Sequence, residues 1–474
     1  MDYKVTIGIE VHCELKTKEK IFSPSNSCYG SMANTNVNII DLGYPGSLPL
    51  LNTEVLRFAI RACKVLNLKI TRDMHFDRKN YFYPDNPKNF QITQNETPIG
   101  RDGYVEIEID GNKKKIEIEE MHIEEDTSKS VHGEKTSLLD FNRAGVPLIE
   151  IVTKPCINSE IEAVKYLEKL RELLIYADVS DCKIEEGSMR CEPNISISKT
   201  DKLGTKIEVK NIGSISNVGE AIKYEVNRQK EILENNGILH EETRRFDDKT
   251  KTTILMRRKE TGNDYRYFPE PDIPYVHLTD EFIEDSLKDL SRMPDERRND
   301  YKTSGILPIN IEKIIANKPL SDYLERFSDI NLVIASNLLL GDISAYLNRE
   351  NKSIMDTKLN DEKFRILVNK LDKNDITNKI FKEILKDIME TDKTIDDIIN
   401  EKGLALVNDD SLIIKIIDKV LDENKNILSD YLNGNERSAK ALMGCVMKEG
   451  KGKINPGIAN QKLIEKLEEL KTKK

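Results

Sequence analysis

Apolar and polar residues alternate in several short segments of roughly the first 290 residues, a pattern typical of β-strands with one buried face. The predicted strands are Val5–Val11, Val105–Ile109, Ile116–Ile118, Ile195–Ile197 and Ile207–Val209. Two helices interrupt them. Ser159 and Glu162 have the spacing of a capping box at the start of a helix with one apolar face. Gly219–Glu234 is the second predicted helix, ending at the stop signal Asn235–Gly237.

The pattern changes after Met293–Pro294, where strand signals end and Leu and Ile recur among charged residues at helical spacing. We therefore predict an α+β protein with three domains. A mixed or antiparallel sheet occupies residues 1–293, an all-α helical domain occupies residues 294–405, and a small α-helical tail domain occupies residues 406–474.

Composition narrows the class of protein. The chain has 474 residues, of which 33% are charged, and a net charge of −10. It has no run of about 18 uncharged apolar residues and no signal-peptide pattern, so we expect neither a membrane span nor secretion. The seven cysteines are never spaced as C-x-x-C, which argues against a disulfide scaffold and a cysteine zinc site and favours the cytoplasm.

The end of the chain has the opposite charge to the rest. From Tyr431 to Lys474, ten Lys and Arg residues against five Glu give a net charge of +5. One interpretation is a solvated helix face, and the other is a small module that contacts a polyanion.

The first predicted strand carries a row of metal-binding residue types. Because successive side chains of a strand point to opposite faces, the aliphatic residues lie on one face and Glu10, His12 and Glu14 on the other. Hard divalent cations prefer oxygen ligands, and an imidazole can complete such a site. The row predicts a cation site, and the alternative is the solvated face of an ordinary antiparallel strand.

A second group of acids follows in Met121–Asp126, at the end of an alternating segment. Strict alternation directs His122, Glu124 and Asp126 to one face and Glu125 to the other. A β-bulge would exchange the two glutamates, so the pattern does not decide which of them enters a site. The alternative is a charged turn.

Two further strands present charged residues on their polar faces. One carries Glu192 beside Arg190, and the other carries Glu208 between Lys206 and Lys210. Together the strands predict one polar sheet face, on which the acids bind cations and the Arg and Lys side chains bind phosphate oxygens. The alternative is that the polar face of each strand is an ordinary exposed surface.

Common motifs of nucleotide and hydrolase sites are absent from the sequence. It contains no P-loop, no G-x-G-x-x-G after a strand, no H-E-x-x-H and no G-x-S-x-G. The residues alone thus indicate metal-assisted phosphoryl or acyl chemistry.

Longer motifs run through the whole chain in a fixed order. They are Gly8–His12, Asn80–Asp85, Gln91–Gln94, Glu124–Asp126, Asn142–Val152, Glu185–Arg190, Lys210–Asn211, Glu241–Arg244, Asp264–Asp272, and Ala439–Leu442 through Asn455–Pro456. In these motifs the sequence resembles the GatB family, the B subunits of the aspartyl/glutamyl-tRNA(Asn/Gln) amidotransferases.

The resemblance implies a ligase that forms carbon–nitrogen bonds with glutamine as amido donor. A catalytic cradle in residues 1–293 would use ATP and Mg²⁺ to phosphorylate the side-chain carboxylate of Glu-tRNA(Gln), Asp-tRNA(Asn) or both. Ammonia would then displace the phosphate, giving Gln-tRNA(Gln) or Asn-tRNA(Asn). The implied partners are the glutaminase (amidase) or A subunit, the small C subunit and the misacylated tRNA, which the tail domain would bind.

The resemblance also assigns roles to residues. The residues expected to bind metal and support catalysis are Glu10, His12 and Glu125, with Glu124 as the alternative to Glu125. Glu192 is a further candidate metal ligand, although Asp is commoner at its position in the family. The residues expected to bind the nucleotide or its phosphates are Lys79, Arg190, Glu208 and Lys210.

One departure from the family concerns zinc. Some members carry two zinc-binding cysteine pairs near the N-terminus, where this chain reads Lys20–Ser25 and Asn38–Asp41 with only Cys28 nearby. We therefore predict no structural zinc.

Two other functions compete with this one. A tRNA-binding scaffold without chemistry would have no need for the acid row, and a lone metal-dependent phosphoesterase would need neither a basic tail nor a glutaminase partner.

Overall fold

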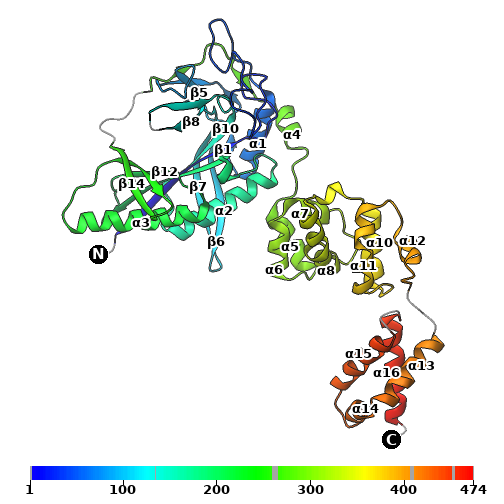
Figure 1. Cartoon of the computed structure of the whole chain (residues 1–474). Coiled ribbons are helices and arrows are strands. Elements are labelled where there is room, and N and C mark those ends of the chain that lie inside the picture. The colour runs from blue at the N-terminus through cyan, green and yellow to red at the C-terminus, as the bar shows by residue number, and fades with distance from the viewer. Residues whose placement is uncertain (1–2, 134, 259–264, 406–409, 451–453, 473–474) are drawn as a thin grey trace. The chain divides into compact units, whose positions relative to one another are not determined.

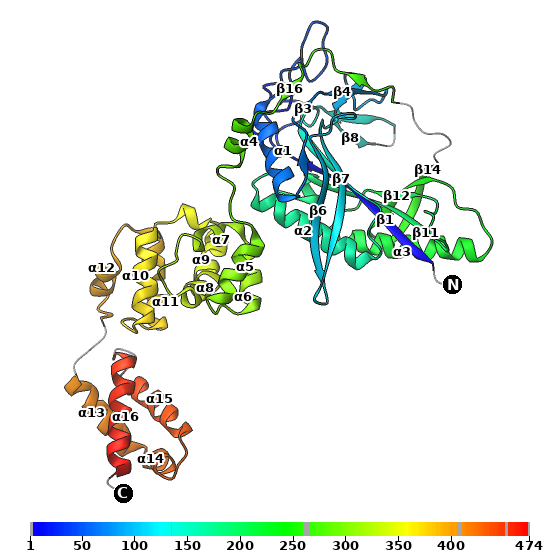
Figure 2. The same ribbon diagram turned by 180° about the vertical axis from the view of Figure 1, so that it is seen from behind.

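Figures 1 and 2 show the computed structural model of the chain, which describes residues 3–133, 135–258, 265–405, 410–450 and 454–472. The chain divides into two compact units, Met1–Pro294 and Asp295–Lys474. The further boundary predicted at residues 405/406 adjoins residues 406–409, which lie outside the described residues.

A nine-stranded mixed sheet organises the first unit, with the strand order β14-β13-β12-β11-β1-β10-β7-β6-β2. Its strands are β1 (Lys4–Glu14), β2 (Lys69–Ile70), β6 (Gly100–Ile109), β7 (Asn112–Glu125), β10 (Pro147–Thr153), β11 (Met189–Ser198), β12 (Ile207–Lys210), β13 (Glu242–Asp247) and β14 (Thr252–Arg258). Among these described strands, β12 and β13 pair in parallel and the other neighbours are antiparallel. All five predicted strands are confirmed, although each is longer in the structure than its alternation indicated.

Helices α2 (Glu160–Tyr176) and α3 (Ile215–Glu234) cover one face of this sheet (Figure 1). Half of the predicted capping box of α2 is present, since the Ser159 side chain accepts a hydrogen bond from the Glu162 amide at 3.1 Å. The Glu162 side chain accepts from the Asn158 amide at 2.7 Å, one residue before the expected partner. The apolar faces of both helices and of α1 (Thr53–Val65) pack with the aliphatic side of the sheet in one hydrophobic core. Burial of this continuous apolar surface is the main stabilising contribution to the unit.

Helix α3 begins earlier than its apolar periodicity predicted. Its N-cap is Ser214, so the helix starts at Ile215 instead of Gly219. Gly219 lies inside the helix, where a Cβ would come within 3.0 Å of the Val164 side chain on α2. Glycine therefore allows close packing of the two helices against each other.

Smaller elements lie on the opposite side of the large sheet (Figures 1 and 2). They form the sheets β15-β4-β5, β16-β3 and β8-β9. Their bounds are β3 (Asp73–Met74), β4 (Asp77–Asn80), β5 (Phe90–Thr93), β8 (Lys129–His132), β9 (Ser137–Asp140), β15 (Phe268–Pro269) and β16 (Val276–His277), and helix α4 (Asp280–Leu287) follows. The uncovered polar face of the large sheet is thereby partly enclosed.

The described part of the second unit is built from helices, as predicted. They are α5 (Pro294–Thr303), α6 (Pro308–Ile315), α7 (Lys318–Leu324), α8 (Leu332–Leu338), α9 (Ser344–Glu350), α10 (Asp361–Asp372), α11 (Asn378–Glu390), α12 (Ile395–Glu401), α13 (Asp410–Glu423), α14 (Lys425–Leu432), α15 (Arg437–Glu449) and α16 (Pro456–Thr472). The last four share a hydrophobic cluster of their own, which includes Ile417, Leu442 and Leu463. No helix in the described residues has the length and apolar character needed to cross a membrane.

Candidate functional site

Strand β1 lies near the middle of the large sheet, between β10 and β11. Ile9, Val11 and Cys13 are buried in the core, whereas Glu10, His12 and Glu14 are only partly buried on the other face. The predicted division of this strand into an aliphatic and a polar face is therefore confirmed. The polar row faces the partly enclosed side of the sheet.

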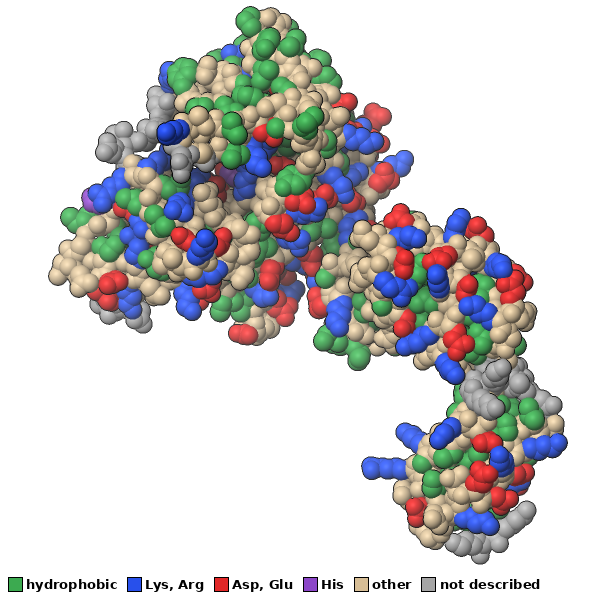
Figure 3. Space-filling view, in the orientation of Figure 1, with side chains coloured by type: hydrophobic (Ala, Val, Ile, Leu, Met, Phe, Trp, Pro, Cys, Tyr) green, Lys and Arg blue, Asp and Glu red, His purple; other side chains and the backbone are tan. Residues whose placement is uncertain are grey.

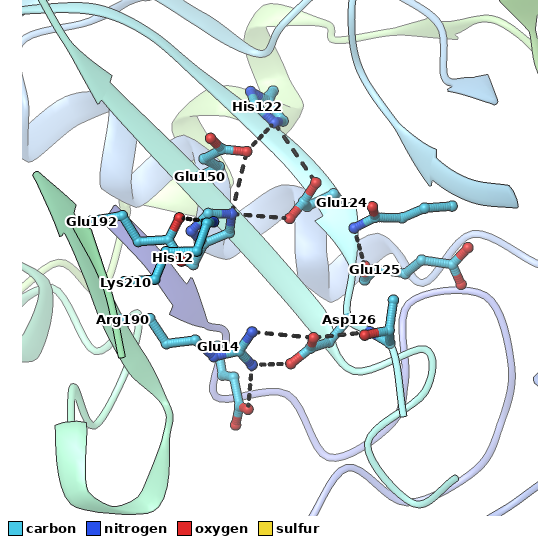
Figure 4. A network of polar contacts seen from close by, with 12 residues as sticks. His12, Glu14, His122, Glu124, Glu125, Asp126, Glu150, Arg190, Glu192 and Lys210 are labelled. Atoms are coloured by element: carbon cyan, nitrogen blue, oxygen red, sulfur yellow. Dashed lines mark hydrogen bonds and ion pairs between the residues drawn. The ribbon is translucent and has the colours of Figure 1, made fainter. Parts of the chain in front are cut away.

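Strand register brings His12 together with acids from two other strands (Figure 4). His12 lies opposite Glu150 on β10, and Glu150 lies opposite His122 on β7. The Glu150 Oε2 atom is 3.4 Å from His12 Nε2 and 2.9 Å from His122 Nε2. Glu124 Oε1 is 3.5 Å from His12 Nε2. One ligand atom from each of His12, Glu124 and Glu150 fits within 4.8 Å of the others, which is the size of a metal site.

Glu124, and not Glu125, is the glutamate that the structure brings to His12. The register of β7 against β10 is regular at this point, without a bulge, so the two side chains point to opposite faces. Glu125 is buried and accepts hydrogen bonds from the Lys88 ammonium and, at 2.8 Å, from the Ile92 amide. The preference for Glu125 in the sequence-based assignment therefore does not match the geometry.

The two histidines and the neighbouring acids shift one another's pKa values. Burial alone would lower the pKa of His12, but the neighbouring carboxylates of Glu150 and Glu124 outweigh it and raise the pKa to about 9. The same balance raises the pKa of His122 to about 10. Burial would raise the pKa of Glu150, yet the two imidazoles hold it well below its usual value. The cluster is thus arranged to hold positive charge.

A second cluster lies beside the first on the same sheet face. Glu10, Glu192 and Glu208 also offer ligand atoms within 4.8 Å of one another. Glu10 lies opposite Glu192, accepts a hydrogen bond from Asn194 at 2.8 Å, and has a pKa raised by burial and by the charge of Glu150. The Lys210 ammonium is 3.0 Å from Glu208 and also contacts Glu192.

Cationic side chains border the acids. Arg190 contacts Asp126 and lies 3.7 Å from Glu14 (Figure 4). Lys79 extends from β4, with its ammonium 5.1 Å from the centre of the Tyr265 ring. Burial would lower the pKa of Lys79, but the charge of Glu124 raises it above its ordinary value. These groups can meet phosphate oxygens, as their residue types suggested.

Two cavities adjoin the polar row. The first, of about 240 Å³, is lined by residues such as Glu10, Gly8, Ile195 and Lys206 and is called the Glu10 cavity below. The second, of about 460 Å³, is lined by residues that include Glu14 and is called the Glu14 cavity. On the face of each unit that Figure 3 shows, side chains of both charges are interspersed.

Most of the predicted residues converge in the folded chain. Glu10, Glu192, Glu208 and Lys210 meet at one cluster, and His12 and Glu124 at the other. Arg190 borders them (Figure 4), and Lys79 is close enough for the charge of Glu124 to raise its pKa. Sequence reasoning did not assign a role to Glu150. The sequence does mark Glu150 as unusual, because it is the one charged residue of the strand Pro147–Thr153. Alternation places His122 on the same face as Glu124 but gives it no role.

The sequence is similar to two family models of known proteins. The profile of the GatB/GatE catalytic domain matches residues 5–284, and that of the GatB domain matches residues 322–467. The chain belongs to the GatB family. The residues matched by the first profile include the whole polar row and both clusters.

Relatives of known name cover the chain almost completely. It is 45% identical over 473 residues to the B subunit of the aspartyl/glutamyl-tRNA(Asn/Gln) amidotransferase of Geobacillus kaustophilus, with 98% of this chain and 99% of the relative aligned. The proteins of the same name from Bacillus velezensis and Limosilactobacillus reuteri are 44% and 45% identical, with the same coverage. GatB membership therefore holds for both units.

Proposed function

We propose that this chain is the subunit of a tRNA-dependent amidotransferase that uses ATP and Mg²⁺ to activate the side-chain carboxylate of Glu-tRNA(Gln), Asp-tRNA(Asn) or both. The observation that carries the proposal is the pair of three-residue ligand clusters on one sheet face of a GatB chain. A scaffold that only presents tRNA has no use for such clusters.

The ligand types suit Mg²⁺. The two clusters offer five carboxylates and one imidazole, and no thiolate, which is the donor set of hard divalent cations. We assign His12, Glu124 and Glu150 to one cation and Glu10, Glu192 and Glu208 to a second. Bound Mg²⁺ would stabilise the negative charge that develops on phosphoryl oxygens.

The nucleotide is assigned to the Glu10 cavity. Val152, Pro155 and Leu203 give its wall apolar surface for a base. Lys206 also lies at the wall, and Lys210 is nearby at the second cluster. Lysine ammonium groups bind phosphate oxygens, so they suit the β- and γ-phosphates. Lys79 and Arg190, at the other cluster, are assigned to the oxygens of the transferred phosphoryl group.

The chemistry explains why the site needs both acids and cations. A carboxylate is a poor electrophile, because nucleophilic attack adds charge to an anion. When one of its oxygens bonds to the γ-phosphorus of ATP, the bond to the ADP oxygen breaks and an acyl phosphate forms. Ammonia then attacks the carbonyl carbon, phosphate leaves with the electron pair of the C–O bond, and the nitrogen loses a proton. The basic side chains offset the charge that accumulates at the phosphoryl group.

The partners follow from the same proposal. A glutaminase, the A subunit, would supply ammonia, the small C subunit would complete a heterotrimer, and the complex would work in the cytoplasm, where tRNA is aminoacylated. Residues 1–293 would act as the catalytic cradle, residues 294–405 as the helical domain and residues 406–474 as the tRNA-binding tail.

The test is an assay of ADP formation by the reconstituted complex with and without Glu-tRNA(Gln). We expect misacylated tRNA to stimulate ADP formation, and Glu10→Ala or His12→Ala to abolish it together with amidation. The variants should retain tRNA affinity and the basal glutaminase activity of the partner. Amidation at the wild-type rate by either variant would contradict the assignment of the polar row.

A further inference from the structure

The motif Glu241–Arg244 takes no part in the chemistry proposed above, although most of it lies on β13, close to the second cluster. In the parallel pairing of β12 with β13, Thr243 lies opposite Glu208, and Arg244 lies opposite Val209. Val209 is buried in the core of the first unit. Because paired residues share a face of the sheet, Thr243 lies on the polar face with Glu208, and Arg244 lies on the face covered by helices.

The Thr243 side chain holds one oxygen of the Glu208 carboxylate. Its hydroxyl donates a hydrogen bond to Glu208 Oε2 at 2.8 Å. Only 2% of Thr243 is exposed, so water does not compete strongly for this bond. The other oxygen, Oε1, is 3.0 Å from the Lys210 ammonium. With Oε2 held by Thr243, Oε1 is the oxygen that the carboxylate presents to a positive charge.

The strand itself does not require a hydroxyl at this position. Valine has nearly the shape of threonine, with a methyl group in place of the hydroxyl, and is equally suited to β-strands. Burial of a hydroxyl lowers stability unless the group is hydrogen-bonded. Packing of β13 alone would therefore be served by valine, and the hydroxyl of Thr243 points to the Glu208 carboxylate as the group that needs it.

The other face of the motif anchors β13 to helix α3. Arg244 donates to the Glu242 carboxylate at 2.7 Å and to the Thr253 hydroxyl of β14 at 2.8 Å. Thr253 in turn donates at 2.9 Å to Glu225 of α3, which is fully buried. Buried networks of this kind make a structure rigid. The strand that carries Thr243 is thus fixed in place beside β12.

We propose that Thr243 is a positioning residue of the second cation site. It orients the Glu208 carboxylate toward the cation that is assigned to Glu10, Glu192 and Glu208. Glutamate has a long side chain with several rotatable bonds, so a hydrogen bond to a buried hydroxyl limits the directions in which its carboxylate can point. The proposal rests on the proposed function and adds how one ligand of its metal site is held.

Mn²⁺ titrations of the reconstituted complex, followed by electron paramagnetic resonance, test this role. Thr243→Val removes the hydroxyl and keeps the shape, and it should raise the Kd for Mn²⁺ by about tenfold or more, as is common when a partner of a metal ligand is lost. Thr243→Ser keeps the hydroxyl and should leave the Kd unchanged. Each titration is made with His12→Gln also present, because this change weakens the first site and leaves the second to dominate the binding curve.

Thr253 offers a matched control on the opposite face of the sheet. Like Thr243, it is a buried threonine whose hydroxyl donates to a glutamate, but that glutamate is Glu225 of α3. Thr253→Val should lower the urea concentration at half-unfolding at least as much as Thr243→Val does. It should leave the Kd for Mn²⁺ unchanged. A purely structural role of Thr243 would make the two variants alike in both measurements.

A double variant shows whether Thr243 acts through Glu208. In a complex that already carries Glu208→Gln, Thr243→Val should cause no further loss of Mn²⁺ affinity, because the carboxylate that it orients is absent. Losses that simply add would contradict the proposal. If Thr243→Val prevents folding, the pair Thr243→Ser and Thr243→Ala gives the same comparison, since these variants also differ by one hydroxyl.

An equal Kd for Mn²⁺ in the complexes with Thr243 and with Thr243→Val would overturn the role of Thr243. The assay of ADP formation separates this failure from failure of the proposed function. If Glu-tRNA(Gln) stimulates ADP formation and Thr243→Val binds Mn²⁺ normally, only the role of Thr243 is wrong. If Thr243→Val weakens Mn²⁺ binding and Glu-tRNA(Gln) does not stimulate ADP formation, the positioning role stands and the proposed function fails.

Discussion

Glu124 and Glu125 are adjacent in the chain, yet the fold gives them different surroundings. Glu124 faces His12, whereas Glu125 is buried against Lys88 on the other side of the strand. Burial raises the pKa of Glu125, although the Lys88 charge acts in the opposite direction. A carboxylate in the first position can bind a cation, and one in the second position stabilises the local fold.

The two glutamates should therefore respond differently to the same substitution. Glu124→Gln should reduce kcat by on the order of 10²–10³-fold and raise the Mg²⁺ concentration needed for half-maximal activity, because one charge-stabilising group is lost. Glu125→Gln should leave that Mg²⁺ concentration unchanged and lower the free energy of unfolding by about 3–5 kcal/mol, because Lys88 loses its buried partner. Mg²⁺ titrations of activity and urea denaturation measure the two effects. The opposite pattern would make Glu125 the ligand.

The raised pKa of His12 predicts how metal binding depends on pH. A metal binds the neutral imidazole, so below pH 9 the cation has to displace a proton from a ring whose pKa is about 9. For each proton displaced, the apparent affinity should fall about tenfold per pH unit as the pH decreases. Titration of the chain with Mn²⁺ at pH 7, 8 and 9, followed by electron paramagnetic resonance, measures this slope. His12→Gln should bind more weakly with a smaller slope, and equal slopes would remove His12 from the site.

Without metal, the contribution of His12 to folding stability changes with pH in the opposite direction to the metal affinity. Because the folded chain raises the pKa of His12 above the ordinary value of 6.5, protonation stabilises it. This contribution is fully present below pH 6.5 and is lost as the pH rises through about 9.

At the scale of elements, strand register decides which residues meet. The antiparallel pairing of β1 with β10 and β11 sets His12 beside Glu150 and Glu10 beside Glu192. A shift of one residue would turn the polar row into the core, so the buried aliphatic face fixes this register. The site thus depends on core packing for its geometry.

The loop after β1 is held by one buried carboxylate. Asp41 accepts hydrogen bonds from the Lys20 ammonium at 3.0 Å, the Ser23 hydroxyl at 2.6 Å and the Ser25 hydroxyl at 2.8 Å. Lys20 is fully buried, and burial lowers its pKa although Asp41 partly offsets this. This ion pair cross-links the stretch for which we predict no structural zinc.

Breaking this pair should destabilise the first unit. Asp41→Asn leaves the Lys20 ammonium buried without its counter-charge and should lower the free energy of unfolding by about 3–5 kcal/mol. The double variant Lys20→Met with Asp41→Asn should be less destabilised, because no charge is left unpaired. Urea denaturation of the three chains measures both effects. If the single and double variants lost equal stability, the ion pair would not be the stabilising contact.

At the scale of the whole molecule, chemistry and tRNA affinity are assigned to different units. The clusters lie in the first unit, and helices α13–α16 have a hydrophobic cluster separate from the core of that unit. Lys440 and Lys448 of α15 are exposed, whereas Lys462 and Lys466 of α16 form ion pairs with Asp410 and Asp418 on α13. Exposed lysines in the tail are suited to RNA phosphates.

Deleting residues from 410 onward should weaken tRNA binding without unfolding the cradle. The KM for Glu-tRNA(Gln) should rise and the salt dependence of binding should become shallower, by a slope of about 0.7–0.9 for each phosphate that is no longer neutralised. Substituting both Lys440 and Lys448 by Gln should reproduce part of the loss of tRNA affinity and of salt dependence. Lys462→Gln removes a lysine that is already paired, so it should change both quantities less. Filter binding at two salt concentrations measures this. Equal slopes for full-length and truncated chains would show that the tail is only a solvated surface.

The sequence by itself determined the fold class and most of the site. Apolar and polar residues alternate along β1 and β11, and apolar residues recur at helical spacing after Pro294. Each of these segments shows by itself which of its side chains are buried, without reference to distant residues. For the same reason, the polar face with Glu10 and His12 was predictable. The motifs of the GatB family added the expected chemistry.

Only the tertiary structure decided how these residues are grouped. Alternation left open whether Glu124 or Glu125 reaches His12, because a bulge would have exchanged them, and the regular register of β7 against β10 selects Glu124. Glu150 joins the site for a similar reason, since its neighbours His12 and His122 are on strands distant from it in the chain. Register between strands depends on long-range packing, which no single segment of the sequence encodes.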